Sequence, residues 1–345
     1  MVTRRLVVDL QAAQAQWSLP PEGAARLRRE APAGWEVHVV AAPTVSDGDG
    51  GRTASAEALA AIREAELYFG YGLPRPLFLA AERLRWVHTA AAGVASLLYP
   101  EMAASDVLLT NSAGVHAVPI AEYVVGGVLF LLRQFDVAVE LQRRGEWSRE
   151  PFVGSASGMR ELGECRALVI GAGGIGGEVA LRLSALGAHC IGVRRRPELG
   201  APTGFARVVG PDEWAALLPE SDLLVIAAPA TPSTRSLVTG RLLDRLPREA
   251  IVVNVARGSL LDEEALADRI ERGTLRGAVL DVFSVEPLPN RSRLWRLPSV
   301  LVTPHVSGVS PGGFWRRELD LFLDNWRRYV DGRPLRNVVD KGAGY

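Results

Sequence analysis

Short apolar runs alternate with amphipathic stretches along the chain, most regularly after residue 167. Apolar runs bounded by turn residues predict buried strands, and longer stretches with a period near 3.6 predict helices. Six strands are expected, near 167–170, 189–193, 223–227, 251–255, 278–282 and 300–302, with helices between them. This alternation predicts a doubly wound parallel sheet.

The residues before 112 show a shorter version of the same pattern, which predicts a second, smaller α/β unit. Strands are expected at 6–8, 35–40, 84–88 and 107–111, and a helix at 54–65. Helices are also expected at 118–133, 137–144 and 314–330. The most apolar stretch, 117–132, contains Pro119 and Glu122 and is too short to cross a bilayer.

Composition narrows the possible functions. The chain has 345 residues, enough for two domains, and 48% of them are hydrophobic. Its 39 basic and 39 acidic residues cancel, so no overall field favours nucleic acid or an anionic membrane. No signal peptide is recognisable, so a cytoplasmic protein is expected. Lys341 is the only lysine, which excludes a P-loop and a Schiff-base mechanism. Cys165 and Cys190 are expected to be buried free thiols, with no metal site.

A glycine-rich loop follows the strand expected at 167–170. It matches the G-x-G-x-x-G pattern and opens a predicted helix, which is the context that a dinucleotide requires. The first glycine permits a tight turn, the second allows close approach of a pyrophosphate, and the third allows helix–strand packing. The loop comprises Gly171, Ala172, Gly173, Gly174, Ile175 and Gly176.

The end of the next strand indicates which dinucleotide is preferred. NAD-binding units usually carry an acidic residue there for the ribose 2′-hydroxyl. This chain has Arg194, Arg195 and Arg196 instead. Because guanidinium groups form forked bonds with phosphate, the sequence predicts NADPH over NADH, with NADH still possible.

Three polar residues lie just beyond the last three predicted strands: Arg257, Glu286 and His305. At the carboxyl ends of parallel strands they can meet in one cleft. An imidazole can protonate the oxygen of a ketone that accepts a hydride, and Glu286 could orient this imidazole and favour its protonated form. Arg257 could bind a substrate carboxylate and polarise the neighbouring carbonyl.

These motifs closely resemble the D-2-hydroxyacid dehydrogenases, over nearly the whole chain and most strongly after Thr110. The resemblance implies that the three residues above are catalytic. It also implies a dinucleotide-binding Rossmann domain, 115–303, inserted into a discontinuous flavodoxin-like substrate domain made of 1–114 and 304–345. The motifs are Val253–Gly258, Leu280–Phe283 with Glu286–Leu288, and Thr303–His305.

Further site residues are implied by the same resemblance. Ala92 and Gly93 match a loop whose N–H groups hold the substrate carboxylate, although Ala95 stands where the family often has Asp. Apart from the resemblance, the position of Tyr71 between Gly70 and Gly72 indicates that it lines the substrate pocket. Cofactor contacts are expected from Pro229, Thr234, Ala256, Asp281 (to the nicotinamide carboxamide) and Gly308.

The predicted function is hydride transfer between NAD(P)H and a small 2-keto acid, with glyoxylate or hydroxypyruvate preferred. Phosphite dehydrogenase and, less favoured, formate dehydrogenase are alternatives within the enzyme class. A nucleotide-sensing corepressor scaffold with little turnover is the alternative from another class. The resemblance also implies a homodimer, in which Trp147 could reach a partner's active site. His116 lies near the expected hinge between the domains and could approach the cofactor.

Overall fold

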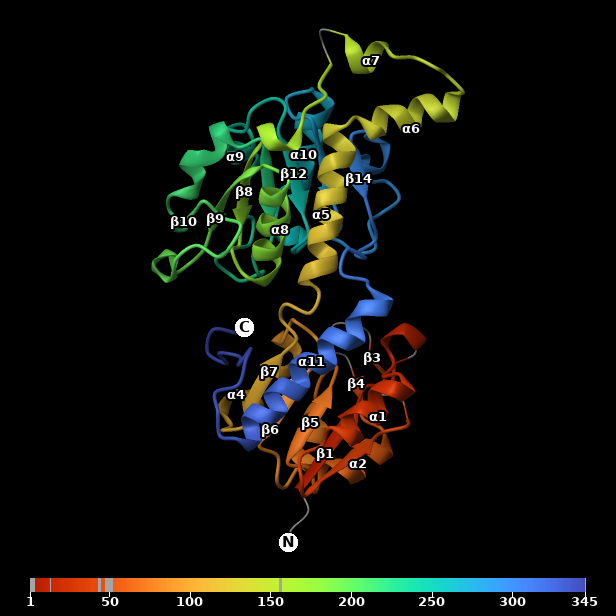
Figure 1. Ribbon diagram of the computed structural model, residues 1–345, viewed down its shortest axis with the longest axis vertical. Coiled ribbons are helices and arrows are strands. Elements are labelled where there is room, and N and C mark those ends of the chain that lie inside the picture. Colours follow the sequence, from red (N-terminus) through yellow and green to blue (C-terminus); the bar gives the residue numbers. More distant parts are fainter. Residues whose placement is uncertain (1–3, 13, 43–44, 47–51, 155–156, 345) are drawn as a thin grey trace. The chain divides into compact units, whose positions relative to one another are not determined.

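The computed structural model describes residues 4–12, 14–42, 45–46, 52–154 and 157–344. The chain divides into two compact units. The first unit comprises residues 1–115 and 310–345, and the second comprises 116–309 (Figure 1). The assignment of substrate binding to the first and dinucleotide binding to the second remains a prediction.

The first unit is built on a five-stranded sheet in which every neighbouring pair is parallel. The strand order places the second strand at one edge, then the first, and then the others in turn, which is the flavodoxin-like order. The predicted fold of this part is confirmed. In spatial order the strands are β2 (Trp35–Val39), β1 (Arg4–Asp9), β5 (Leu67–Gly70), β6 (Trp86–Thr89) and β7 (Leu108–Asn111), with a separate small hairpin of β3 (Val45–Ser46) and β4 (Arg52–Thr53).

Helices cover both faces of this sheet because its strands alternate apolar side chains between the faces. Leu6 and Val8 pack with α1 and α11, whereas Val7 packs on the opposite face with α2, α3 and α4. Figure 1 draws α11 across the sheet beside α1. The helices are α1 (Pro21–Arg29), α2 (Ala56–Ile62), α3 (Arg75–Ala80), α4 (Pro100–Ala104) and α11 (Pro311–Val330).

The second unit contains a seven-stranded sheet, again with every neighbouring pair parallel. Counted from its own first strand the order is 3-2-1-4-5-6-7, so chain order reverses beside β8, as in a Rossmann sheet. The predicted doubly wound sheet is confirmed. In spatial order the strands are β10 (Arg207–Val209), β9 (His189–Val193), β8 (Arg166–Ile170), β11 (Leu223–Ile226), β12 (Ile251–Asn254), β13 (Gly277–Leu280) and β14 (Val300–Val302).

The two faces of this sheet form separate cores. Ala167 and Val169 pack under α5 and α8, which contact each other (Figure 1). Leu168 and Ile170, the alternate residues of the same strand, pack against α9, α10 and a 3-10 segment at 214–220. The helices are α5 (Ala117–Leu132), α6 (Phe135–Arg144), α7 (Glu150–Val153), α8 (Gly174–Ala185), α9 (Gly240–Leu243) and α10 (Glu263–Glu271).

Four strands were missing from the sequence prediction: the two-residue strands β3 and β4 of the hairpin, and β5 and β10. β5 is only four residues long and ends at Gly70, and β10 is a three-residue edge strand in which only Val209 is fully buried. Both runs are too short to show a clear period. The helix expected at 54–65 is shorter in the structure, Ala56–Ile62.

Lys341 fastens the C-terminal segment to the first unit. Its Nζ donates to the carbonyl oxygens of Met102, at 2.9 Å, and Ser105, at 2.8 Å, at the end of α4. A cation suits this position because the last carbonyls of a helix lack partners within the helix. Among the described helices, none is long and apolar enough to span a membrane.

Candidate active site

The candidate residues of the second unit lie at one edge of its sheet, which we call the carboxyl edge. Since the strands are parallel, the segments that follow β8, β12, β13 and β14 leave from the same edge. These segments carry the glycine loop, Arg257, Glu286 and His305. The structure therefore brings the predicted cation, carboxylate and imidazole to the same edge as the glycine loop.

Glu286 and His305 form a hydrogen-bonded pair. The imidazole Nδ1 of His305 lies 2.8 Å from Oε2 of Glu286, and Oε1 accepts a hydrogen bond of 2.9 Å from the N–H of Phe283. Burial acts to raise the pKa of Glu286, but the bonds from His305 and Phe283, with the charges of His305 and Arg257, outweigh burial and lower it. The carboxylate is therefore ionised at neutral pH and can orient the imidazole.

Asp281 fixes the loop that carries His305. The carboxylate is fully buried and accepts from the Thr303 hydroxyl at 2.5 Å and from the N–H groups of Val306 at 2.8 Å and Ser307 at 2.9 Å. The N–H of His305 donates to the carbonyl of Asp281, at 2.9 Å. The sequence analysis did not foresee this role, and the contact of Asp281 with a nicotinamide carboxamide remains a prediction.

Arg257 lies three residues beyond the end of β12, at the start of a short 3-10 turn. Its Nη1 donates to the carbonyl of Ala256, at 2.7 Å, and Asn254 donates to the carbonyl of Arg257, at 3.0 Å. Among the described residues no carboxylate forms an ion pair with this exposed guanidinium. Arg257 thus has the geometry to bind an external carboxylate.

The glycines of the loop have the three environments that a dinucleotide-binding turn requires. Gly171 has a φ of +103°, and a Cβ there would lie 2.6 Å from the carbonyl oxygen of Ala227. A Cβ on Gly176 would lie 2.0 Å from the carbonyl oxygen of Gly171, so only glycine permits this close packing. A Cβ on Gly173 would meet nothing within 4 Å, which leaves room for a ligand. Gly174 and Ile175 form the first turn of α8.

The predicted 2′-phosphate residues follow β9. Arg194 Nη1 donates to the carbonyl of Gly200, at 2.8 Å, and Arg195 and Arg196 are exposed. After β11, the hydroxyl of Thr234 donates to the carbonyl of Pro229, at 2.7 Å, which closes a compact turn. Both segments start at the carboxyl edge; their contacts with a cofactor remain predictions.

Gly308 and His116 lie next to each other in the second unit. The Nδ1 of His116 is 3.0 Å from the carbonyl oxygen of Gly308. His116 immediately precedes α5, so this contact links that helix to the loop beyond His305. Ala256 is nearly buried beside Arg257. The expected approach of Gly308, Ala256 and His116 to the cofactor remains a prediction.

The predicted substrate residues of the first unit follow two adjacent strands. Tyr71 comes directly after β5, and its hydroxyl donates to the carbonyl of Trp17, at 2.5 Å. Burial raises the pKa of Tyr71, so the phenol stays protonated. Ala92 and Gly93 lie in the exposed loop after β6. Their role in substrate binding remains a prediction.

Glu318, a fully buried acid in α11, was not predicted from the sequence. It lies between Phe314 and Phe322, four residues from each, on the apolar stripe of the helix. A carboxylate inside such a stripe is the signal that could have identified it, because a buried acid requires polar partners.

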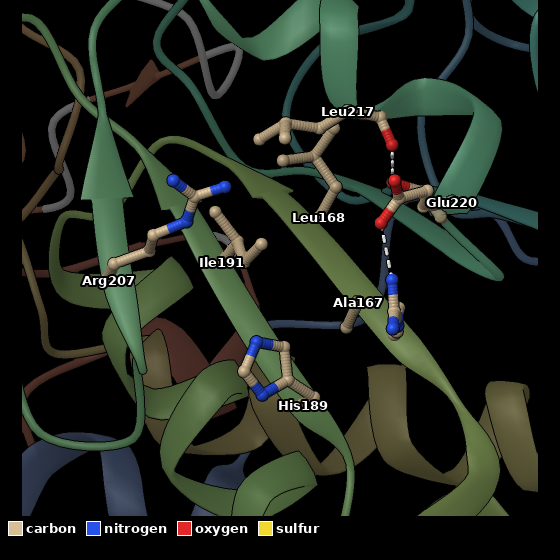
Figure 2. Close-up of a pocket in the computed structure, with 9 residues that line it drawn as sticks. Ala167, Leu168, His189, Ile191, Arg207, Leu217 and Glu220 are labelled. Atoms are coloured by element: carbon tan, nitrogen blue, oxygen red, sulfur yellow. Dashed lines mark hydrogen bonds and ion pairs between the residues drawn. The ribbon is translucent and has the colours of Figure 1, made fainter.

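The structure also contains a cavity of about 440 Å³ in the second unit (Figure 2). It lies near the amino ends of β8, β9 and β10, where Arg166, His189 and Arg207 begin their strands. Figure 2 shows Glu220 and Leu217 at one side of the cavity, and the guanidinium of Arg166 donates to the Glu220 carboxylate. None of the predicted site residues lines it. Among the described residues, no cluster of three or more His, Cys, Asp or Glu could hold a metal ion.

Comparisons with known proteins agree with this geometry. Residues 125–307 match the family model described as D-isomer specific 2-hydroxyacid dehydrogenase, NAD binding domain. Glyoxylate/hydroxypyruvate reductase A of Salmonella typhimurium is 33% identical over 276 residues, which cover 77% of this chain and 84% of that reductase.

The similarity to solved structures extends over nearly the full length of this chain. A D-isomer specific 2-hydroxyacid dehydrogenase from Xanthobacter autotrophicus Py2, in complex with NADPH and MES, has a TM-score of 0.78 and 29% identity, covering 99% of this chain and 100% of that one. An NADPH-dependent glyoxylate/hydroxypyruvate reductase from Sinorhizobium meliloti, in complex with NADP and sulfate, has a TM-score of 0.75 and 27% identity, with the same coverage. The sequence match across more than half of the chain and the shared fold establish that this protein belongs to the D-isomer specific 2-hydroxyacid dehydrogenase family.

Proposed function

We propose that this protein reduces small 2-keto acids with NADPH, and that glyoxylate and hydroxypyruvate are its substrates. The observation that carries the proposal is the pair of Glu286 and His305, whose carboxylate and imidazole are 2.8 Å apart at the carboxyl edge. The similarity to two proteins named as glyoxylate/hydroxypyruvate reductases supports the choice of substrate.

In this proposal Arg257, Glu286 and His305 are the catalytic residues. Arg257 binds the substrate carboxylate through its forked N–H groups and polarises the adjacent carbonyl. His305 donates a proton to the carbonyl oxygen, and bound NADPH supplies the hydride to the carbonyl carbon. Glu286 keeps the imidazole oriented and stabilises its protonated form. The product is the corresponding 2-hydroxy acid.

The remaining contacts with substrate belong to the first unit. Ala92 and Gly93 offer exposed backbone N–H groups to the substrate carboxylate, and Tyr71 lines the pocket. Small residues suit this loop because a side chain would keep a ligand away from the backbone.

The residues present fit a dinucleotide with an additional phosphate. The open space at Gly173 accepts a pyrophosphate, and the N–H groups of Gly174 and Ile175 at the start of α8 favour its negative charge. Arg194 and Arg195 bind the 2′-phosphate. Further cofactor contacts come from Pro229, Thr234, Ala256, Asp281 and Gly308.

The test is oxidation of NADPH and NADH with glyoxylate, hydroxypyruvate, pyruvate and phenylpyruvate. We expect turnover with the two small polar acids and a preference for NADPH. His305→Ala should abolish turnover while NADPH binding is retained. A preference for NADH would contradict the role given to Arg194 and Arg195. Binding of NADPH without turnover of any keto acid would favour a nucleotide-sensing scaffold instead.

The proposal includes a homodimer formed through α6 and α7. Trp147, between these helices, is 96% exposed, and Phe135 and Val153 are also exposed apolar residues. Figure 1 shows α6 and α7 standing out from the sheet of the second unit. Exposed apolar residues gathered on one segment are typical of an interface. Sedimentation should give a dimer for the native chain and a monomer for the double variant Phe135→Ser, Trp147→Ser; a native monomer would contradict this assignment.

A further inference from the structure

The loop after β6 is fastened to the end of β7 through its carbonyl oxygens. The Ser112 hydroxyl shares its one proton between Glu318 and the carbonyl of Thr89, the last residue of β6, at 2.9 Å, and the carbonyl of Ala91 accepts from the Ser112 N–H at 3.1 Å. The carbonyl of Ala92 accepts from Nδ2 of Asn111 at 2.8 Å. Two consecutive residues, Asn111 and Ser112, therefore hold two carbonyls of this loop and the carbonyl of the last residue of β6.

These bonds determine the direction of the loop's N–H groups. In a trans peptide the carbonyl of one residue and the N–H of the next point to opposite sides of the chain. Because the carbonyls of Ala91 and Ala92 point toward Asn111 and Ser112, the N–H groups of Ala92 and Gly93 point away from them. Both residues are exposed, and neither N–H has a hydrogen-bond partner among the described residues. Two adjacent donors are thus turned to the same side.

The amide of Asn111 suits this task because it donates and accepts at the same time. While Nδ2 donates to Ala92, Oδ1 accepts from the N–H of Ala113 at 3.2 Å. Asn337 holds the residue itself: the Asn111 N–H donates to the carbonyl of Asn337 at 3.2 Å, and the Asn337 amide donates back at 3.1 Å. Asn111 is 8% exposed, so water does not readily replace these bonds.

Ser112 also contacts a buried acid, Glu318. Oε1 of Glu318 lies 2.8 Å from the Ser112 hydroxyl and 3.3 Å from Nε2 of His88, and the side chains of His88 and Glu318 are fully buried. His88 is in turn 2.7 Å from the hydroxyl of Thr110. Among the described residues, Oε2 of Glu318 is buried without a hydrogen-bond partner, so the carboxyl group depends on the contacts of Oε1 with Ser112 and His88.

We propose that Asn111 is a positioning residue for the substrate carboxylate, and that Ser112, held by Glu318 and His88, supports it. By fixing the carbonyls of the loop, Asn111 keeps the N–H groups of Ala92 and Gly93 aimed at an anionic carboxylate. The inference rests on the proposed function, in which this loop binds the substrate. It assigns no chemical step to Asn111, which acts only through the loop.

The test uses Asn111→Asp, which keeps the size and the acceptor but loses the donor to Ala92. The KM for glyoxylate should rise about tenfold or more, a tenfold change being about 1.4 kcal/mol. The kcat should stay within about threefold and the dissociation constant of NADPH within about twofold, because neither depends on this loop. A merely structural role would lower kcat or thermal stability without raising KM selectively.

Asn325→Asp is the matched control. Asn325 is also a buried asparagine of the first unit that donates to a backbone carbonyl, that of Arg336, at 3.0 Å. It should leave the KM for glyoxylate unchanged. Ser112→Ala, which loses the hydroxyl but keeps the N–H bond to Ala91, should raise KM by about threefold. Ser112→Ala also serves as the test if Asn111→Asp does not fold.

Binding of oxalate to the complex of the full chain with NADPH separates this inference from the proposed function. Weaker oxalate binding by Asn111→Asp, with Asn325→Asp unaffected, supports the positioning role even if the native protein turns over none of the keto acids. Unchanged KM and unchanged oxalate affinity in an active Asn111→Asp variant would overturn it and leave the proposed function standing. No binding of oxalate to the native protein would overturn the carboxylate site and the positioning role together.

Discussion

Replacing Glu286 by glutamine should change the pH range in which the enzyme reduces keto acids. The substitution keeps the shape of the side chain but removes the charge that lies 2.8 Å from Nδ1 of His305. Reduction requires the protonated imidazole, and a neighbouring carboxylate favours that form. The interaction with His305 helps to lower the pKa of Glu286, and the same interaction favours the proton on the imidazole, which the variant loses. The decline of reduction with rising pH should therefore begin at lower pH in Glu286→Gln.

The size of the shift follows from the exposure of the pair. A hydrogen bond to a charged group contributes about 1.5–3 kcal/mol to stability. The side chains of His305 and Glu286 are 47% and 37% exposed, so water screens their interaction and the lower end of the range applies. About 1.4 kcal/mol corresponds to one pH unit. At a pH high enough for the imidazole to be mostly neutral in both the native enzyme and the variant, reduction by the variant should be about tenfold slower than by the native enzyme.

The assay is kcat/KM measured against pH in both directions. Oxidation of the 2-hydroxy acid requires the neutral imidazole, so its rise with pH should also move to lower pH by about one unit. Glu264→Gln is the control, because this glutamate is 77% exposed and pairs with Arg293 instead. The reasoning is refuted if reduction by Glu286→Gln declines at the same pH as in the native enzyme, or if the two directions shift oppositely.

Three further predictions concern the second unit. Gly258→Ala would place a Cβ 1.9 Å from a backbone carbon of the loop after β13. Urea unfolding should therefore show that the free energy of unfolding falls by about 2 kcal/mol or more, and kcat should also fall. An unchanged urea midpoint would contradict this prediction. Arg276→Met would leave the buried carboxylate of Asp136 without the guanidinium that donates to it at 2.8 and 3.0 Å. The free energy of unfolding in urea should fall by roughly 3 kcal/mol, and adding Asp136→Leu should recover most of this loss. Burial raises the pKa of Cys165 and of Cys190 to about 11, so a thiol reagent at neutral pH should modify neither until urea unfolds the chain, whereupon both react.

The sequence predicted the parts of the structure that depend on local pattern. The strands that precede Arg257 and His305 lie within mostly apolar runs, and the glycine loop has a fixed spacing, so both were recognisable. β10 was not, because the exposed Arg207 leaves only two apolar residues in this strand. The fold class followed from the alternation of strands and helices, which does not depend on the exact ends of each element.

Contacts between distant residues explain what the sequence could not predict. Glu318 bonds Ser112 across 206 positions and lies beside His88 across 230. No local spacing encodes such a pair; only the return of α11 to the first sheet brings it together. Asp281 is a similar case: its position after β13 was recognised, but its three bonds to the loop at 303–307 depend on the adjacent strand β14.

The position of Lys341 has a practical consequence for chemical labelling. It is the only lysine in 345 residues, so amine-directed reagents meet a single side chain, and a lysine-specific protease has one site to cut. That amine is held by the carbonyls of Met102 and Ser105, and burial lowers its pKa. Its rate of modification therefore reports how often the C-terminal segment detaches from α4.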